Sequence, residues 1–184
     1  MVRRLARRVI SATVSASTAA ATAPWWKKLI AEREEDKSVK SLVSALDSAF
    51  ADLIDSLKEI VRSVDPALLY QRTNNLSVGE QILRSGAAIE QTFGGLTANL
   101  WDDPFEWTLP ETLSTSEAIV AYLSEVDSTR RRVFESIDAD GALAKYVAVP
   151  SGEPKTLIEL LLETIVRASE YRGRAVATLK ILSG

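Results

Sequence analysis

The chain has 184 residues, with 22 Lys and Arg against 25 Asp and Glu, and it contains neither His nor Cys. Without these two side chains the sequence cannot supply thiol nucleophiles, disulfides, Ser-His-Asp triads or zinc sites built from Cys and His. The formal charge of −3 gives no reason to expect nucleic-acid binding. Gly and Pro are few, at 8 and 6 residues, which favours one domain of long helices.

The first 31 residues differ from the rest of the chain in charge. They hold six basic residues and no acidic one, so the remainder carries 16 basic residues against all 25 acidic ones. Residues 1–10 form a short basic amphipathic pattern, and residues 11–23 are almost entirely Ser, Thr and Ala. This composition is typical of an organellar transit peptide, and the leading arginines favour mitochondrial over plastid import. A basic tail on a bacterial cytoplasmic protein is the alternative.

The same segment also suits a docking arm that is retained in the mature protein. Trp25 and Trp26 provide flat aromatic area beside the cations of Lys27 and Lys28, which suits docking on an anionic membrane surface or on a protein surface. The two Trp residues could instead pack on the end of the helical domain. The candidate docking residues are Arg3, Arg4, Arg7, Arg8, Trp25, Trp26, Lys27 and Lys28. We therefore expect an N-terminal extension over residues 1–37 and a helical domain over residues 38–184.

Apolar residues at steps of three and four predict a first helix over residues 41–64. The predicted buried face consists of Leu42, Leu46, Phe50, Leu53, Leu57, Ile60 and Val64. Asp65 and Pro66 then end the helix. A second helix over residues 77–101 opens with Ser77 and Glu80, a capping box in which each side chain bonds the other's backbone N–H.

Three aromatic residues, Trp101, Phe105 and Trp107, lie in or beside the loop that follows. They could line a pocket mouth or plug the end of a bundle, and we expect the second. A third helix over residues 114–137 opens with a second capping box, Ser114 and Glu117, and carries a run of three arginines, 130–132, that we expect on a solvated face.

The chain then has an extended segment at residues 146–149 and a last helix that starts from a third capping box, Thr156 and Glu159, and ends at Gly184. Four amphipathic helices of this length predict an all-α fold, a four-helix bundle. The first two connections are longer than a simple up-and-down bundle needs. No apolar run approaches the length of a transmembrane helix.

Two segments resemble the DinB-like four-helix bundles. Ser77-Val78-Gly79-Glu80-Gln81 is similar to the Trp-Ser-Val-Gly-Glu type motif that opens helix two in that family, with Leu76 in place of the Trp. The segment from Tyr171 to Leu182 is similar to the family's fourth helix, where two His four residues apart precede Arg-Gly-Gln. The resemblance covers about residues 40–184 and implies a DinB-like four-helix bundle with an N-terminal extension.

The resemblance also implies a metal site made of three histidines, as in metal-dependent thiol transferases and hydrolases. The matching positions here are Ser85, Arg167 and Tyr171, so all three ligands are replaced. A guanidinium has no free lone pair and stays protonated, so it would repel a metal ion. We expect no metal and no cofactor at these positions, and an ion pair of Arg167 with Glu163 or Glu170 in their place.

Carboxylates alone could bind Mg²⁺ or Mn²⁺, and Glu80, Glu90, Glu159, Glu163 and Glu170 lie on helices two and four. Glutamates at capping positions and on solvated faces are the ordinary case, so we expect no such metal site. The sequence contains no phosphate-binding glycine loop and no nucleophile elbow.

These observations favour a non-catalytic DinB-like bundle, an accessory or scaffold subunit of a mitochondrial assembly whose partners are protein subunits. One alternative is a metal-independent transferase or hydrolase that uses Tyr171, with Arg167 binding an anionic substrate. Another is a module that binds a small apolar ligand in a cavity lined by Phe93, Trp101 and Phe134.

Overall fold

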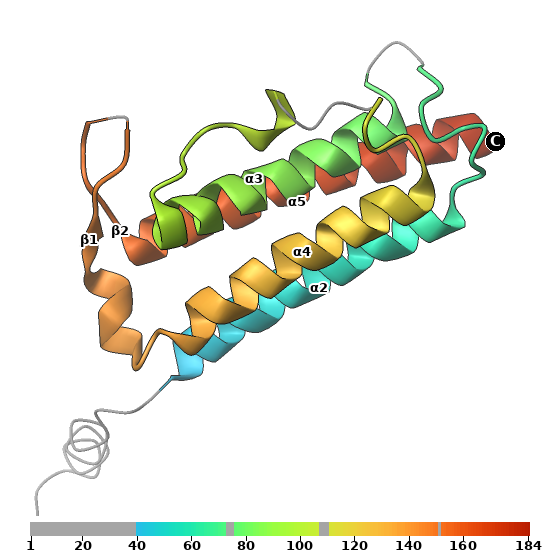
Figure 1. Ribbon diagram of the computed structural model, residues 1–184. Coiled ribbons are helices and arrows are strands. Elements are labelled where there is room, and N and C mark those ends of the chain that lie inside the picture. Colours follow the sequence, from blue (N-terminus) through green and yellow to red (C-terminus); the bar gives the residue numbers. More distant parts are fainter. Residues whose placement is uncertain (1–39, 73–75, 107–110, 151) are drawn as a thin grey trace, which may run out of the picture. The chain divides into compact units, whose positions relative to one another are not determined.

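The structure is a computed structural model that describes residues 40–72, 76–106, 111–150 and 152–184. Four long helices form a bundle, which confirms the predicted all-α architecture (Figure 1): α2 (Ser41–Ser63), α3 (Val78–Ala98), α4 (Ser116–Glu135) and α5 (Leu157–Ser183). Short 3-10 helices, η1 (Pro104–Glu106) and η2 (Asp140–Ala144), lie in the connections. Strands β1 (Tyr146–Val147) and β2 (Lys155–Thr156) pair antiparallel just before α5. Within the described ranges, no helix is both long enough and apolar enough to span a membrane.

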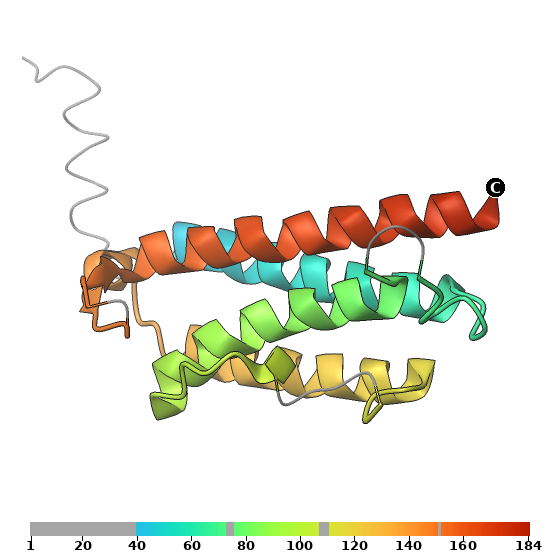
Figure 2. The ribbon, with the colours of Figure 1, turned by 90° about the horizontal axis from the view of Figure 1, so that it is seen from above.

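The helices form two pairs, α3 beside α5 and α2 beside α4 (Figures 1 and 2). The connection after α3 turns back and follows that helix, so Trp101 packs against Gly95 and Phe105 lies under the guanidinium of Arg84. This return path explains why the connection is long. It also places a loop over the α3 side of the α3–α5 pair, beside the candidate site.

The helix starts confirm two of the three predicted capping boxes. Ser77 and Glu80 bond each other's backbone N–H at the start of α3, and Thr156 and Glu159 do so at the start of α5. The third prediction was wrong by one residue, because Thr115, and not Ser114, caps α4 by accepting from the Ala118 N–H at 3.2 Å.

Helix α2 has no side-chain cap from its own N-cap residue, Lys40. Asp140 of η2 serves instead, accepting from the backbone N–H groups of Leu42 and Val43 at 3.0 and 2.9 Å and from the Ser41 hydroxyl at 3.1 Å. These bonds lower the pKa of the Asp140 carboxyl, and the backbone amides of Leu42 and Val43 make the largest contributions. A residue almost 100 positions away therefore fixes the start of the first helix of the bundle.

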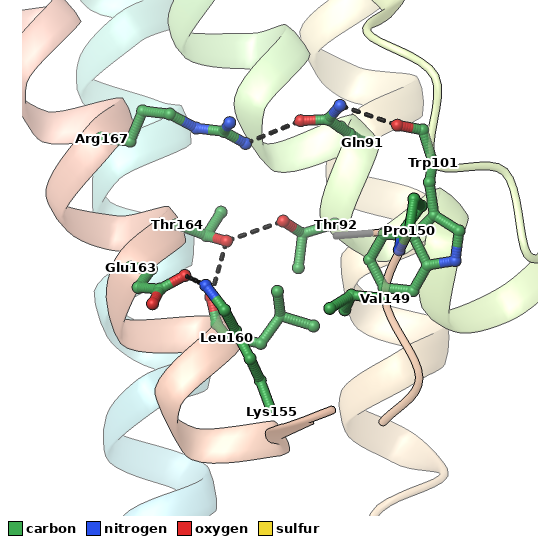
Figure 3. Close-up of a pocket in the computed structure, with 10 residues that line it drawn as sticks. All are labelled: Gln91, Thr92, Trp101, Val149, Pro150, Lys155, Leu160, Glu163, Thr164 and Arg167. Atoms are coloured by element: carbon green, nitrogen blue, oxygen red, sulfur yellow. Dashed lines mark hydrogen bonds and ion pairs between the residues drawn. The ribbon is translucent and has the colours of Figure 1, made fainter. Parts of the chain in front are cut away.

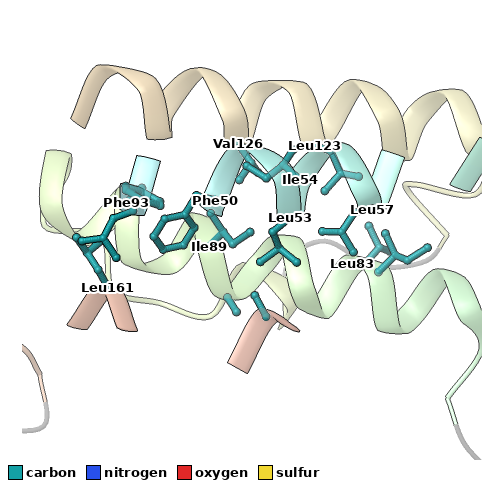
Figure 4. Packing of buried hydrophobic residues seen from close by; sticks show 14 of the residues in the cluster. Phe50, Leu53, Ile54, Leu57, Leu83, Ile89, Phe93, Leu123, Val126 and Leu161 are labelled. Carbon is teal, nitrogen blue, oxygen red and sulfur yellow. The ribbon is translucent and has the colours of Figure 1, made fainter. Parts of the chain in front are cut away.

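The core runs the length of the bundle (Figure 4). It contains an aromatic cluster of Phe50, Phe93 and Phe134. Their ring centroids lie 5.0, 5.9 and 5.7 Å apart. The predicted buried face of α2 is correct in its middle and wrong at two positions, because Leu42 is 42% exposed and Ile60 is only partly buried. Val43, Ile54 and Val61 are buried instead. The buried face of α2 repeats every 3.6 residues, and its position around the helix is determined by the packing of α4 against α2.

The expectation of a solvated face for the arginine run was wrong for Arg130, whose side chain is only 4% exposed. Its guanidinium binds the carboxylate of Asp127, one turn earlier on α4, at 2.9 Å. It also binds Asp47 on α2, through the Asp47 carboxylate and through the Asp47 backbone carbonyl at 3.1 Å. Arg131, 65% exposed, pairs with the other oxygen of Asp127 at 2.7 Å. Burial of Arg130 is tolerated because both of its charge partners lie in reach.

Candidate functional site between α3 and α5

Three hydrogen bonds between buried polar groups join α3 to α5, and we call them the polar seam. Gln81 Nε2 donates to Thr178 Oγ1 at 2.8 Å, Ser85 Oγ donates to the carbonyl of Ala168 at 2.8 Å, and the hydroxyls of Thr92 and Thr164 lie 2.7 Å apart. Side-chain bonds between two buried helices remove the cost of burying these groups and fix the helices in one register. The seam follows the interface in which the family resemblance predicts a metal site.

Ser85, the first of the three positions that the resemblance matches to metal ligands, lies at 0% exposure in the middle of the seam. Its hydroxyl is engaged by Ala168, the residue that follows Arg167. Ser85 therefore contributes a hydrogen bond that links α3 to α5.

Arg167, the second position, does not form the ion pair that we expected. Glu163 binds Lys155 at 2.5 Å, and Glu170 binds Arg174 on the next turn of α5. The Arg167 Nη2 atom donates instead to Gln91 Oε1 at 2.9 Å and to the carbonyl of Ala88 at 3.3 Å, both on α3. The expected partners lie four residues before and three residues after Arg167 on its own helix, but its side chain bonds to α3 instead.

Tyr171, the third position, meets Arg167 at a small cavity of about 40 Å³ that Gln91, Asp103 and Phe105 also line. The guanidinium of Arg174 lies 5.6 Å from the centre of the Tyr171 ring. A cavity of this volume has room for water molecules but not for an organic substrate.

A larger cavity, of about 340 Å³, lies on the other side of Arg167 and Gln91 (Figure 3). The residues that line it come from α3, from α5, from the loop after α3 and from the β1–β2 hairpin: Gln91, Thr92, Trp101, Val149, Pro150, Lys155, Leu160, Glu163, Thr164 and Arg167. Trp101 therefore lines a cavity and does not only plug the end of the bundle, which corrects our expectation for it. Trp107 lies outside the described residues.

The acidic residues do not form a metal site. Glu80 and Glu159 serve in capping boxes, Glu90 accepts from the Tyr122 hydroxyl at 2.6 Å, and Glu163 and Glu170 bind basic residues. In the part of the chain that the structure describes, no three Asp or Glu side chains come together in a way that could hold a metal ion. Ser85, Arg167 and Tyr171 do not fit the family's metal either, since a fixed cation occupies one of the three positions.

Two tyrosines near the α3–α4 side have raised pKa values. Burial, followed by the nearby Glu90 and Asp103 carboxylates, raises the pKa of Tyr122 far above its usual value. Burial, followed by Glu80 and Glu111, raises the pKa of Tyr70 to about 12, and its hydroxyl donates to the carbonyl of Leu113. Both phenols stay protonated at neutral pH and act as hydrogen-bond donors between segments.

The apolar cavity that we considered does not form from the three residues we named. Phe93 and Phe134 pack against each other and Phe50 in the core, at 0% and 5% exposure, while Trp101 lies at the larger cavity. The candidate docking residues Arg3 to Arg8 and Trp25 to Lys28 lie outside the described residues, so the docking arm and the boundary at residue 37 stay predictions.

The sequence pointed to Ser85 and Arg167 but not to the residues that surround them. A signal that could have identified Gln81, Thr92, Thr164 and Thr178 is that they are polar residues that interrupt apolar faces at helical spacing on the two helices that pair.

No model of a known protein family matches the chain, and no curated protein matches it.

Proposed function

We propose that the chain is a non-catalytic DinB-like bundle that serves as an accessory or scaffold subunit of a multiprotein assembly in mitochondria. One observation carries the proposal: two of the three positions that the resemblance matches to metal ligands form hydrogen bonds between α3 and α5. Ser85 binds Ala168, and Arg167 binds Gln91 and Ala88. The mitochondrial location is supported by the acid-free composition of residues 1–31.

The outer face of α5 offers a surface for a partner subunit. Leu162, Val166 and Ile181 are 48%, 67% and 70% exposed, and the exposed Gly173 and Ala177 lie between them. Steps of four and seven residues bring all five to one face of the helix, which we call the α5 strip. Exposed apolar side chains that share one face of a helix are a candidate contact surface.

The charges beside the α5 strip indicate the kind of partner. Glu163, Arg167, Glu170 and Arg174 alternate in sign along one edge of the strip. A helix of another subunit with an aliphatic face and the opposite order of charges would match both features. We therefore propose such a helix as the occupant.

The test is purification of the tagged full chain from its native source, followed by mass spectrometry of the whole assembly. We expect a defined set of partners in fixed stoichiometry and a new N-terminus within residues 1–37. Val166→Glu and Ile181→Glu together should release the partners, because both place a charge in the strip. Leu100→Glu is the matched control, since Leu100 is 62% exposed but lies after α3.

Recovery of a partner-free monomer from the native source would contradict the proposal. If the purified particle contains only two copies of this chain, the helix that covers the α5 strip is the α5 of the second copy, and the proposed partner subunit is wrong. Loss of partners in the Leu100→Glu variant as well would show that the α5 strip is not the contact.

A further inference from the structure

The larger cavity between α3 and α5 has the size and the chemistry of a ligand site. Its volume of about 340 Å³ lies within the range that small-molecule sites occupy. One wall carries polar groups from Gln91, Thr92, Thr164 and Arg167, and the other is formed by Trp101, Val149 and Pro150 (Figure 3). A ligand with one polar end and one apolar body would meet a matching surface at each end.

Arg167 supplies a positive charge to this cavity that no carboxylate neutralises. Both acceptors of its described bonds, Gln91 Oε1 and the Ala88 carbonyl, are neutral and bind the same atom, Nη2. The other guanidinium donors, on Nε and Nη1, have no acceptor among the residues that the structure describes. A guanidinium presents its donors in a planar fork that matches the two oxygens of a carboxylate.

The remaining charged groups of the cavity cancel each other. Lys155 and Glu163 form an ion pair with a distance of 2.5 Å, so the lining retains one net positive charge, that of Arg167. The smaller cavity on the other side of Arg167 is also lined by Arg84 and Asp103, whose formal charges sum to zero. The local charge therefore favours an anion over a cation.

Gln91 holds the guanidinium in place before any ligand arrives. Its Oε1 accepts from Arg167 at 2.9 Å, while its Nε2 donates to the carbonyl of Trp101 at 2.7 Å. The side-chain amide of Gln91 thus fixes both the guanidinium of Arg167 and the backbone of Trp101, whose ring forms part of the apolar wall. The Trp101 ring is fixed from behind, because it packs directly on Gly95, where a Cβ would lie only 2.4 Å from the ring. A site held in this way loses little entropy on binding.

We propose that this cavity binds a small organic carboxylate, with the carboxylate on Arg167 and a flat apolar body against Trp101, Val149 and Pro150. The site shares Glu163 and Arg167 with the edge of the α5 strip, but binding of the ligand to the isolated chain does not require the proposed partner of α5. It needs no catalysis and no metal.

The test is isothermal titration of the full chain with benzoate, 3-phenylpropanoate and 2-naphthoate, each paired with its neutral amide. We expect at least one carboxylate to bind and its amide to bind about tenfold more weakly or worse, because charge-assisted hydrogen bonds are lost. Arg167→Gln should weaken the carboxylate by about the same factor and leave the amide unchanged.

Arg174→Gln is the matched control, because Arg174 is an exposed arginine two turns further along α5 and does not line the cavity. It should change the affinity less than about twofold, which excludes a general effect of lost positive charge. A second variant, Gln91→Leu, should also weaken the carboxylate, since it frees Arg167 and leaves the charge in place. Circular dichroism of each variant checks that the bundle is folded.

The proposal is overturned if none of the three carboxylates binds the wild-type chain. It is equally overturned if the amides bind as tightly as the carboxylates, or if folded Arg167→Gln retains the wild-type affinity.

Discussion

The hydroxyl of Ser85 on α3 donates a 2.8 Å hydrogen bond to the carbonyl oxygen of Ala168 on α5, in the middle of the buried polar seam. By resemblance, Ser85 is a position where DinB-like bundles carry a metal-ligand histidine. Here the side chain is shorter and its single donor is used within the fold. In this chain, side-chain hydrogen bonds join α3 to α5 along their interface.

Replacing Ser85 with Ala should lower the free energy of unfolding by about 1 kcal/mol, the usual contribution of one buried hydrogen bond. Urea unfolding followed by circular dichroism measures this change. Ser124→Ala is the control, because the exposed Ser124 hydroxyl bonds only the Val120 carbonyl of its own helix. If the two variants are equally stable, the seam contributes nothing at this position.

Replacing Arg130 with Met should destabilise the chain by about 3 kcal/mol, because it leaves the buried Asp127 with one partner fewer and breaks the link to α2. Arg132→Met removes an arginine from the same run but at an exposed position, and should cost less than about 0.5 kcal/mol. Thermal unfolding of both variants separates the two cases. Similar melting temperatures would argue that Arg130 is as solvated as the sequence alone suggested.

Replacement with Ala should change the free energy of unfolding in opposite directions at Gly95 and at Gly173. At Gly95 the new Cβ would collide with the Trp101 ring, so we expect a loss of about 1 to 3 kcal/mol from the forced rearrangement. At Gly173, on the exposed face of α5, a Cβ meets nothing within 4 Å, and Ala should stabilise the helix by up to about 1 kcal/mol. Urea unfolding gives both values, and a stabilised Gly95→Ala variant would contradict the packing of Trp101.

The contribution of Glu80 to stability should depend on pH. Burial alone would raise the pKa of its carboxyl, but hydrogen bonds from Ser77 and Arg72 outweigh burial and lower it below the usual value of 4.5. A carboxyl with a lowered pKa in the folded state contributes its full stability above the unfolded pKa and loses it as the pH falls through the folded pKa.

Glu80→Gln should therefore be about 1 kcal/mol less stable than wild type at pH 7, and the difference should shrink as the pH falls below about 4.5. Urea unfolding at pH 7 and at successively lower pH measures the difference. Glu59→Gln, at an exposed position of α2, should show no more than about 0.5 kcal/mol at any pH. A constant difference between Glu80→Gln and wild type would rule out ionisation of Glu80 as its source.

The sequence alone determined the four helices, their ends to within a few residues and two of the three predicted capping boxes. These features depend on periodicity and on hydrogen bonds between residues three or four apart, which the order of residues contains directly. The absence of His and Cys was equally decisive, because it excluded thiol chemistry and metal sites built from Cys and His.

Only the tertiary structure decided which helix faces meet and which distant groups pair. Asp140 caps a helix that starts almost 100 residues earlier, and Arg130 is buried because Asp47 lies across from it on α2. Arg167 binds Gln91 on α3 and not the two glutamates near it on α5. Each choice depends on how neighbouring helices are rotated and spaced. A long polar side chain reaches several partners of similar energy along its own helix, so the partner it takes is set by packing between helices and not by the local sequence.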